Sequence, residues 1–281
     1  DVDRTDTDEP DAPGRTRRGY CYNILVSGLD DDNGGSDTNI LVRFDVPNKR
    51  IDLVSLPRDT LLHNEYRNNK LNFAYAKGGT ELLMEQIENL LGIPVDFYVT
   101  VNLKGFIALV DQIDGVDFDI PINMDYDDPY QDLHIHFTKG PRHLNGQEAM
   151  EVVRFRHNND GTGYGTEDIG RIGTQQAFLK AVAKQLLQIG NVKNIPALVD
   201  IFYTYVKTDL TTGNLVWLGN EALNIGTENI HFATLPGDGS GYYNKQSVYV
   251  LDAQATCDLV NEALNPYNEA LTLEDMDILV P

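Results

Sequence analysis

Three short apolar runs near the start of the chain constrain the fold more than any other feature. Residues 22–29 (YNILVSGL), 38–45 (TNILVRFD) and 51–56 (IDLVSL) have the length and composition of buried strands. A loop rich in aspartate and glycine separates the first two runs, and Pro47-Asn48 forms a turn between the second and third. We therefore expect one buried strand followed by a hairpin-like pair of strands.

Helical and strand-like patterns alternate through the rest of the chain. Further strands are expected at residues 97–101, 116–120 and 230–235, and helices at residues 70–76, 80–91, 103–113, 145–153, 171–189, 214–224 and 252–264. No linker divides this pattern, and 281 residues of which 41% are hydrophobic can bury a full core. The sequence predicts a single α/β domain, in which a central mixed β-sheet is flanked by helices on both faces.

The overall charge limits the classes of partner. The formal net charge is -21 at pH 7, whereas nucleic acid normally binds a net basic surface. We therefore expect no nucleic-acid partner, and any anion site must be a local pocket.

Residues 1–18 are polar and are expected to form a disordered lead-in or tether to a domain at residues 19–281. Because the first residue is Asp1 rather than Met, we expect a processed chain or an excised domain.

The cysteines and histidines give weaker signals. Two cysteines, Cys21 and Cys257, are too few for a cysteine metal cluster. They could form one bridge in an oxidising compartment or remain two unpaired thiols, and both alternatives stay open. His134 and His136 alternate on an expected strand, but the spacing offers no third metal ligand. We favour a structural or surface role for this histidine pair.

Charged side chains gather where the expected elements end. Arg58 and Asp59 follow a strand, at the edge of an α/β sheet where ligands commonly bind. Arg154 and Arg156 close a helix, and Arg171 begins another. Arginine suits phosphate because its planar fork donates two parallel hydrogen bonds and its charge does not titrate away. Several arginines that converge would match a pyrophosphate.

An alternative for each arginine stays open. Each could form an exposed ion pair with a nearby acid, because such pairs are common and contribute little. The nearby acids are Glu151, Asp160, Glu167 and Asp168. Residues two apart on a helix diverge by about 200°, so Arg154 and Arg156 can share a ligand only where the backbone becomes extended.

The first loop holds candidate metal ligands. Asp30 and Asp37 could supply oxygen ligands for Mg²⁺, which typically takes one or two carboxylates together with substrate phosphates and water. The alternative is that the aspartate run is a solvated loop, because it lacks the spacing of an EF-hand. The spacing alone leaves both possibilities open.

These segments, in this order, resemble the LytR-CpsA-Psr family of cell-wall phosphotransferases. Each fragment is modest, but the ordered series is specific and covers roughly residues 22–187. The matching segments are residues 23–30 (NILVSGLD), 36–38 (SDT), 55–60 (SLPRDT), 70–79 (KLNFAYAKGG), 92–94 (GIP), 98–102 (YVTVN), 115–117 (GVD), 143–149 (HLNGQEA), 153–156 (VRFR), 168–172 (DIGRI) and 175–176 (QQ). One departure is Thr174, where the family often has arginine.

The resemblance implies an α/β sheet with helices on its faces, a long apolar cavity for a polyprenyl chain, and a pyrophosphate site at the mouth of that cavity. The residues that resemble the family's pyrophosphate-binding arginines are Arg58, Arg154, Arg156 and Arg171. The residues that would assist them are Lys70 and Gln175. The residues that resemble its Mg²⁺ ligands are Asp30 and Asp37.

The implied activity moves a phosphorylated glycan from a polyprenyl-pyrophosphate carrier to an acceptor hydroxyl of the cell wall, commonly on peptidoglycan. The resemblance places this reaction outside the cytoplasmic membrane, to which an anchor preceding this chain would attach it. Asp59 or a metal-bound carboxylate would help deprotonate the hydroxyl, although an ion pair with an arginine makes Asp59 a poor proton acceptor. Two alternatives are hydrolysis of the pyrophosphate in the same pocket, and a non-catalytic receptor for the wall polymer or lipid carrier.

Overall fold

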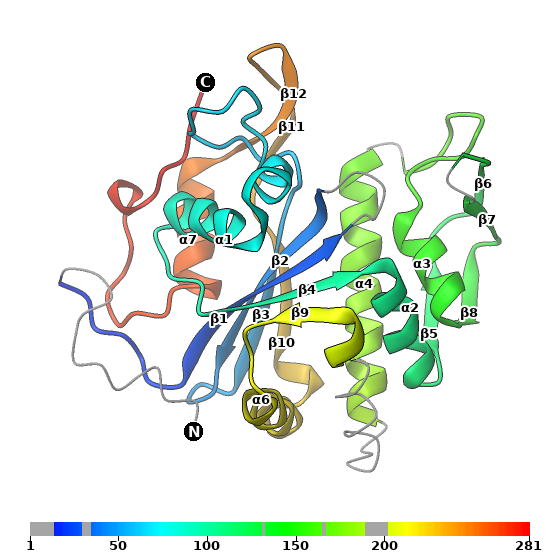
Figure 1. Cartoon of the computed structure of the whole chain (residues 1–281), viewed down its shortest axis with the longest axis horizontal. Coiled ribbons are helices and arrows are strands. Elements are labelled where there is room, and N and C mark those ends of the chain that lie inside the picture. The colour runs from blue at the N-terminus through cyan, green and yellow to red at the C-terminus, as the bar shows by residue number, and fades with distance from the viewer. Residues whose placement is uncertain (1–13, 30–34, 131–132, 165–166, 189–201) are drawn as a thin grey trace. The chain divides into compact units, whose positions relative to one another are not determined.

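The chain divides into two compact units. The computed structural model describes residues 14–29, 35–130, 133–164, 167–188 and 202–281 (Figure 1). Unit 1 comprises Asp1–Val101 with Lys207–Pro281, and unit 2 comprises Asn102–Val206. Each unit has a hydrophobic core of its own, and the two are described in turn.

Unit 1 is built on a six-stranded sheet with the order β10-β3-β2-β1-β4-β9. Its strands are β1 (Cys21–Leu29), β2 (Ser36–Asp45), β3 (Arg50–Leu56), β4 (Phe97–Asn102), β9 (Val206–Thr208) and β10 (Ile230–Thr234). β2 is antiparallel to both β1 and β3, whereas β10 runs parallel to β3. The three apolar runs are therefore adjacent strands, and the predicted α/β class with a central mixed sheet is confirmed.

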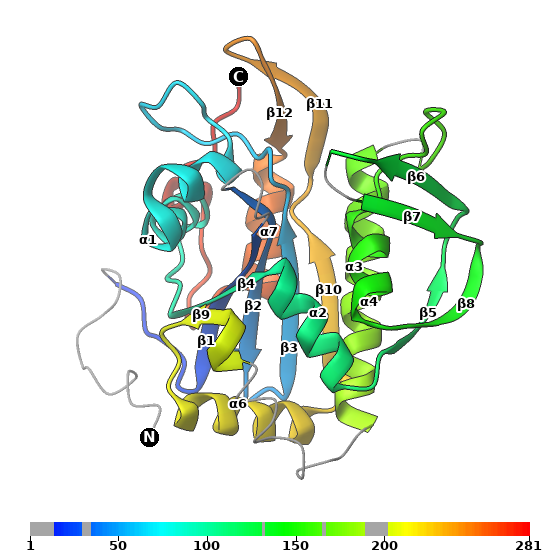
Figure 2. The ribbon, with the colours of Figure 1, turned by 45° about the vertical axis from the view of Figure 1, so that its right-hand side comes forward.

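Helices cover both faces of this sheet (Figure 2). On one face, Leu25 and Leu41 belong to a core shared with α1 (Leu71–Leu91) and α7 (Ala253–Ala263). Tyr22 points to the other face, because neighbouring strand residues alternate in direction. There its ring meets Trp217 of α6 (Thr212–Ile225), with ring centroids 6.0 Å apart.

Helix α1 contains the two helical segments that the sequence predicts. Gly78 and Gly79 between them have non-helical dihedral angles, and the φ of 69° at Gly79 is a conformation that glycine adopts without strain. Gly92, with a φ of 66°, ends the helix, and its N–H donates to the Glu88 carbonyl at 2.8 Å. Glycine therefore sets both the interruption and the end of α1.

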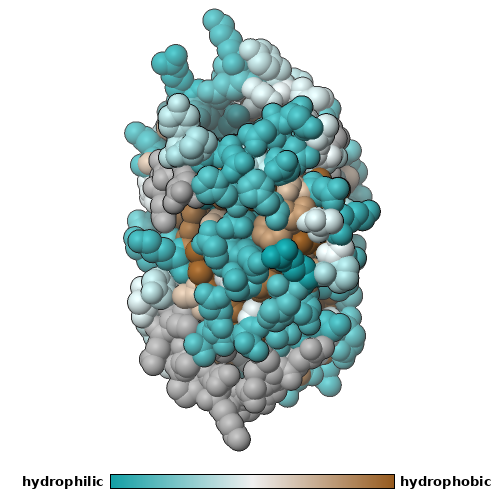
Figure 3. All heavy atoms as spheres, turned by 90° about the vertical axis from the view of Figure 1, so that its right-hand side faces the viewer, coloured by the Kyte–Doolittle hydropathy of each residue, from teal (hydrophilic) through white to brown (hydrophobic). Residues whose placement is uncertain are grey.

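The described part of unit 2 combines two small sheets with several helices. Its elements are α2 (Leu103–Gln112), β5 (Val116–Ile120), β6 (Met124–Asp128), β7 (Leu133–Phe137), β8 (Gly140–Leu144), α3 (Gly146–Arg154) and α4 (Glu167–Gln188). β5 pairs with β8, and β6 pairs with β7. Buried and exposed side chains alternate strictly along β5 and β7. Figure 3 views the molecule from the right-hand side of Figure 1. On this face most of the coloured surface is hydrophilic, with apolar residues between the hydrophilic ones.

The structure contains strands that the sequence patterns do not predict. They are β6, β8, β9 and the hairpin of β11 (Gly237–Tyr243) with β12 (Gln246–Leu251). β6 carries three aspartates, and β11 carries three glycines, which are residue types that individually disfavour strands. Pairing with a neighbouring strand overrides these local preferences. α4 also begins at Glu167 rather than at the predicted Arg171.

Part of the predicted lead-in is bound to unit 1. Arg15 pairs with Asp275 at 2.6 Å, and Arg17 pairs with Asp96 at 2.5 Å. The Arg18 N–H donates to the Pro266 carbonyl at 2.9 Å. The ordered unit therefore begins before the boundary predicted at residue 18, and residues 1–13 lie outside the described residues.

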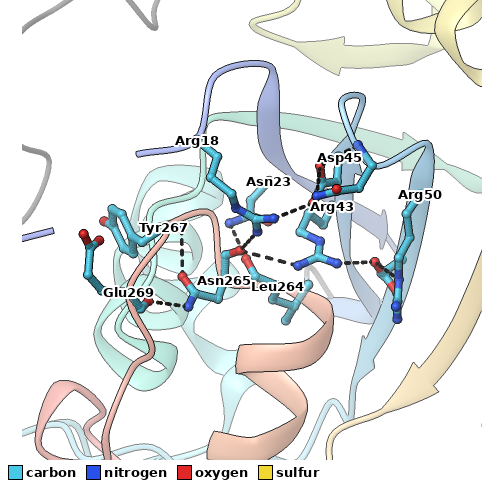
Figure 4. A network of polar contacts seen from close by, with 11 residues as sticks. Arg18, Asn23, Arg43, Asp45, Arg50, Leu264, Asn265, Tyr267 and Glu269 are labelled. Carbon is cyan, nitrogen blue, oxygen red and sulfur yellow. Dashed lines mark hydrogen bonds and ion pairs between the residues drawn. The ribbon is translucent and has the colours of Figure 1, made fainter. Parts of the chain in front are cut away.

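A buried ion-pair network lies on the sheet of unit 1 (Figure 4). Arg43 on β2 and Asp52 on β3 stand opposite each other in the strand register, and their Nη2 and Oδ2 atoms are 2.7 Å apart. The Arg50 guanidinium reaches the other oxygen of Asp52 at 2.7 Å. Both Arg43 and Asp52 are almost fully buried, so neither charge is compensated by water.

A cavity of about 450 Å³ borders this network. The residues that line it include Arg18, Arg43, Arg50, Glu262 and Asn265. This lining is polar and charged, so the cavity does not suit a polyprenyl chain. The apolar lipid cavity stays a prediction.

Both cysteines are free and buried, which resolves the alternative that the sequence leaves open. Burial raises the pKa of the Cys21 thiol to about 11, and burial also raises the pKa of Cys257.

The thiolate is the reactive form of cysteine, so we expect neither thiol of the native protein to react with Ellman's reagent at pH 8. Both should react in denaturant. If neither cysteine reacts with the reagent in denaturant, Cys21 and Cys257 are joined by a disulfide.

Candidate active site

The backbone around Arg58 and Asp59 is fixed by a turn and by two neighbouring elements. Pro57 ends β3, and its carbonyl accepts hydrogen bonds from the Thr60 N–H at 3.0 Å and the Thr60 hydroxyl at 2.7 Å. The Tyr249 N–H of β12 donates to the Asp59 carbonyl at 2.8 Å. These contacts hold residues 57–60 as a rigid turn at the carboxyl end of β3.

The same turn also caps helix α1. The Asn72 N–H donates to the Arg58 carbonyl at 2.9 Å, and the Leu71 N–H donates to the Thr60 carbonyl at 3.0 Å. The first N–H groups of a helix lack partners within the helix, and Lys70 at the N-cap forms no side-chain cap. The turn supplies these partners instead, and so brings Lys70 next to Arg58 and Asp59.

Four predicted site residues of unit 1 lie together, and we call them the unit 1 group: Asp37, Arg58, Asp59 and Lys70. The Arg58 guanidinium forms an ion pair with the Asp37 carboxylate, and its Nε lies 3.6 Å from Asp59 Oδ1. The Lys70 ammonium contacts the other oxygen of Asp59 at 3.2 Å. All four side chains are between 19% and 29% exposed, so each remains accessible to a ligand.

Arg58 forms ion pairs, but not with the nearby acids named in the alternative. Its partners are members of the predicted site rather than acids on a solvated face. Asp59, between Arg58 and Lys70, is positioned to orient these two cations. Asp30, predicted to act beside Asp37, lies outside the described residues.

In unit 2, the backbone becomes extended between Arg154 and Arg156. Asn145 and Glu148 form a capping box at the start of α3, and Arg154 is the last residue of that helix. Phe155 leaves the helix with φ -59° and ψ 134°. The condition under which Arg154 and Arg156 can share a ligand is therefore met.

Phe155 anchors this change of direction. Its side chain is 1% exposed, and its ring meets the ring of Tyr164 with centroids 5.6 Å apart. Because the buried Phe155 lies between them, it anchors the backbone of Arg154 and Arg156 to the core of unit 2. Arg156 itself is exposed.

Helix α4 carries the other two predicted residues of unit 2. Arg171 and Gln175 are four residues apart and share one helical face. The Gln175 amide donates to the Val153 carbonyl at 3.1 Å, so it stabilises the end of α3 immediately before Arg154. Arg171 is 5% exposed. We call Arg154, Arg156, Arg171 and Gln175 the unit 2 group.

Thr174 and Tyr164 link helix α4 to the segment around Phe155. The sequence does not predict this contact. The buried Thr174 hydroxyl contacts the Tyr164 hydroxyl at 2.7 Å and the Gly170 carbonyl at 3.1 Å. Burial raises the pKa of Tyr164. A Cβ at Gly170 would lie 2.2 Å from the Cβ of Tyr164, so glycine is required there. Thr174 is the position that departs from the family pattern, whereas Tyr164 lies in a loop that carries no motif in the sequence.

Asp37 has the chemistry of a Mg²⁺ ligand. Its carboxylate is 29% exposed and lies within the unit 1 group. Mg²⁺ usually takes one or two carboxylates and completes its octahedron with water and phosphate oxygens, so a site needs no third acid. Asp37 therefore fits the predicted role.

Comparison with known proteins identifies the class to which this fold and these residues belong. The model of the LytR_cpsA_psr family matches residues 4–265. The chain belongs to this family.

Two curated relatives and one solved structure illustrate the similarity. The polyisoprenyl-teichoic acid–peptidoglycan teichoic acid transferase TagV of Bacillus subtilis (strain 168) is 32% identical over 248 residues, which are 84% of this chain and 61% of that protein. The corresponding transferase TagU of Bacillus cereus is 32% identical over 244 residues, which are 85% of this chain and 76% of that protein. The crystal structure of B. subtilis TagV has a TM-score of 0.74 and 27% identity, covering 94% of this chain and 100% of the solved chain.

The chain thus spans less than two thirds of the length of TagV. No helix in the described part of the chain is both long and apolar enough to cross a membrane.

Proposed function

We propose that this chain transfers a phosphorylated glycan from a polyprenyl-pyrophosphate carrier to a hydroxyl of a cell-wall acceptor such as peptidoglycan. The observation that carries the proposal is the unit 1 group, in which Arg58 and Lys70 are held by a rigid turn and remain partly exposed. The names of the relatives TagV and TagU, which are transferases of teichoic acid to peptidoglycan, support the same reaction.

The donor pyrophosphate is the anion that these cations would bind. Arg58 and Lys70 of the unit 1 group and Arg154, Arg156 and Arg171 of the unit 2 group would each donate to its oxygens. Arginine is suited to this role because two parallel donors match two phosphate oxygens.

In the reaction, the acceptor oxygen attacks the phosphorus that carries the glycan. A bond forms between them, and the bond from that phosphorus to the bridging oxygen breaks, releasing polyprenyl phosphate. The arginines stabilise the negative charge that grows on the departing phosphate, which is the main contribution a protein makes to phosphoryl transfer.

The proton of the acceptor hydroxyl must pass to a base. Asp59 is a carboxylate of the unit 1 group, but its oxygens already face Arg58 and Lys70. We therefore assign Asp59 mainly to orientation of these cations, and the base to Asp59 or to a carboxylate that binds metal. Asp37 and Asp30 would hold Mg²⁺, which would neutralise phosphate charge when bound.

The location of this reaction follows from its substrates. A lipid-linked donor and a wall acceptor meet at the outer surface of the cytoplasmic membrane, and we propose that a segment preceding this chain anchors it there.

The test is a transfer assay with defined components. The chain is incubated with Mg²⁺, a polyprenyl-pyrophosphate-linked glycan and peptidoglycan fragments, and products are analysed by mass spectrometry. We expect a phosphodiester between glycan and peptidoglycan together with released polyprenyl phosphate. Release of free glycan phosphate at the same rate without acceptor would indicate a hydrolase. Saturable donor binding without any turnover would indicate a receptor.

A further inference from the structure

We propose that Asp127, His134 and His136 on the hairpin of β6 and β7 bind a divalent transition-metal ion of the Zn²⁺ class, with Asp125 beside them. This site is independent of the proposed transfer reaction. The sequence shows the two histidines without a third ligand, and the strand pairing supplies the missing carboxylates from β6.

The strand register places these four side chains on one face. Asp127 stands directly opposite His134, and Asp125 stands directly opposite His136. Residues two apart on a strand share a face, so all four point to the same side of the hairpin. The intervening Ile135 is fully buried, whereas the four side chains are exposed. An ion at this site would be reachable from solvent.

The ligand atoms are already close to the spacing that a metal requires. His136 Nε2 lies 3.3 Å from Asp127 Oδ1, and His134 Nδ1 lies within hydrogen-bond distance of the same carboxylate. One ligand atom from each of the three residues lies within 4.8 Å of the others. Ligands bound to Zn²⁺ at about 2.0–2.1 Å in a tetrahedron are roughly 3.3 Å apart. Rotation of exposed side chains alone would complete the geometry.

The donor set indicates the class of metal. Two imidazoles and a carboxylate are typical ligands of Zn²⁺ and other late first-row ions, whereas Mg²⁺ and Ca²⁺ prefer oxygen ligands only. Asp125, whose carboxylate contacts His136 Nδ1 at 2.8 Å, can orient that ring or fill the fourth position. Water would fill the position otherwise.

The backbone beneath the site is held in place by the segment that follows Arg156. The Asp125 N–H donates to the Asn158 side chain at 2.7 Å, and the Asp127 N–H donates to the Asn159 side chain at 2.7 Å. Asn159 in turn donates to the Asp127 carbonyl at 3.1 Å. Both ligand-bearing positions of β6 are thus fixed, which lowers the cost of ordering the site on binding.

Zinc titration of the tag-free chain, after dialysis against a chelator, tests this site. Isothermal titration calorimetry should show one Zn²⁺ per chain, and Co²⁺ should give the visible absorption of a tetrahedral site. Zn²⁺ should also raise the melting temperature, whereas an equal concentration of Mg²⁺ should not compete with it. We expect the double variant His134→Ala/His136→Ala to lose at least about tenfold in Zn²⁺ affinity.

His143→Ala is the matched control. His143 contacts Asp117 at 2.8 Å on the neighbouring pair of strands, so it is also an exposed histidine with an acidic partner, but among the described residues it belongs to no group of three possible metal ligands. This variant should bind Zn²⁺ like the wild type, and circular dichroism of the metal-free variants should match the wild type. Absence of saturable Zn²⁺ binding, or binding that survives the double substitution, would overturn the proposal.

Discussion

Replacement of Arg58 by alanine is expected to lower the rate of glycan transfer by about 100- to 1,000-fold, the usual effect of removing one donor to a charge that develops in the transition state. Arg58 is held by the turn that also caps α1, so its guanidinium is positioned before substrate binds. Arg58→Lys should recover only part of the rate, because lysine keeps the charge but loses the planar fork.

The rate is measured in the transfer assay under single-turnover conditions, together with the free energy of unfolding. The ion pairs of Arg58 are partly exposed, so its loss should change stability by less than about 1 kcal/mol. Arg67→Ala is the matched control, since Arg67 is an exposed arginine of the same unit outside the unit 1 group. Transfer at the wild-type rate by Arg58→Ala would contradict the role assigned to this residue.

Replacement of Asp52 by alanine is expected to lower the free energy of unfolding by about 3–5 kcal/mol, the cost of leaving a buried charge without its partner. Arg43 and Asp52 are 3% and 2% exposed, and their side chains are 2.7 Å apart. Without Asp52, the Arg43 guanidinium would keep its hydrogen bond to the Asn265 carbonyl at 3.4 Å. That single long hydrogen bond cannot compensate for the lost carboxylate.

Urea unfolding followed by circular dichroism measures this effect. Arg142→Ala is the control, because its ion pair with Glu148 has the same 2.7 Å length but lies at the surface, and it should cost less than about 1 kcal/mol. The double variant Arg43→Met/Asp52→Leu should recover most of the loss, since it removes both charges together. An Asp52→Ala protein as stable as the wild type would show that the pair is solvated in solution.

The parts of the fold that the sequence predicts well carry strong local signals. The apolar runs that form β1, β2 and β3 and the capping box of Asn145 are examples, and so is the glycine that ends α1. In contrast, β6 and β8 consist largely of polar residues, and only their pairing with β7 and β5 makes them strands. Such pairing is non-local, so a reading along the chain does not detect it.

The same distinction applies to the candidate site. The residue types and positions of Arg58, Asp59 and Lys70 can be predicted from the segments in which they lie. Their partners cannot, because the contact of Arg58 with Asp37 and that of Lys70 with Asp59 depend on the turn after β3 meeting β2 and α1. His134 and His136 give the clearest example, since their carboxylate partners come from the register of β6 against β7.

The measurement that tests the central claim most directly is binding of a short polyprenyl pyrophosphate to the wild type, Arg58→Ala, Arg156→Ala and the double variant, by calorimetry with Mg²⁺. If these arginines bind the pyrophosphate, each single variant should lose at least about tenfold in affinity, and the double variant should lose more than either single variant. Arg142→Ala should bind like the wild type. Undiminished affinity in both single variants would contradict the account.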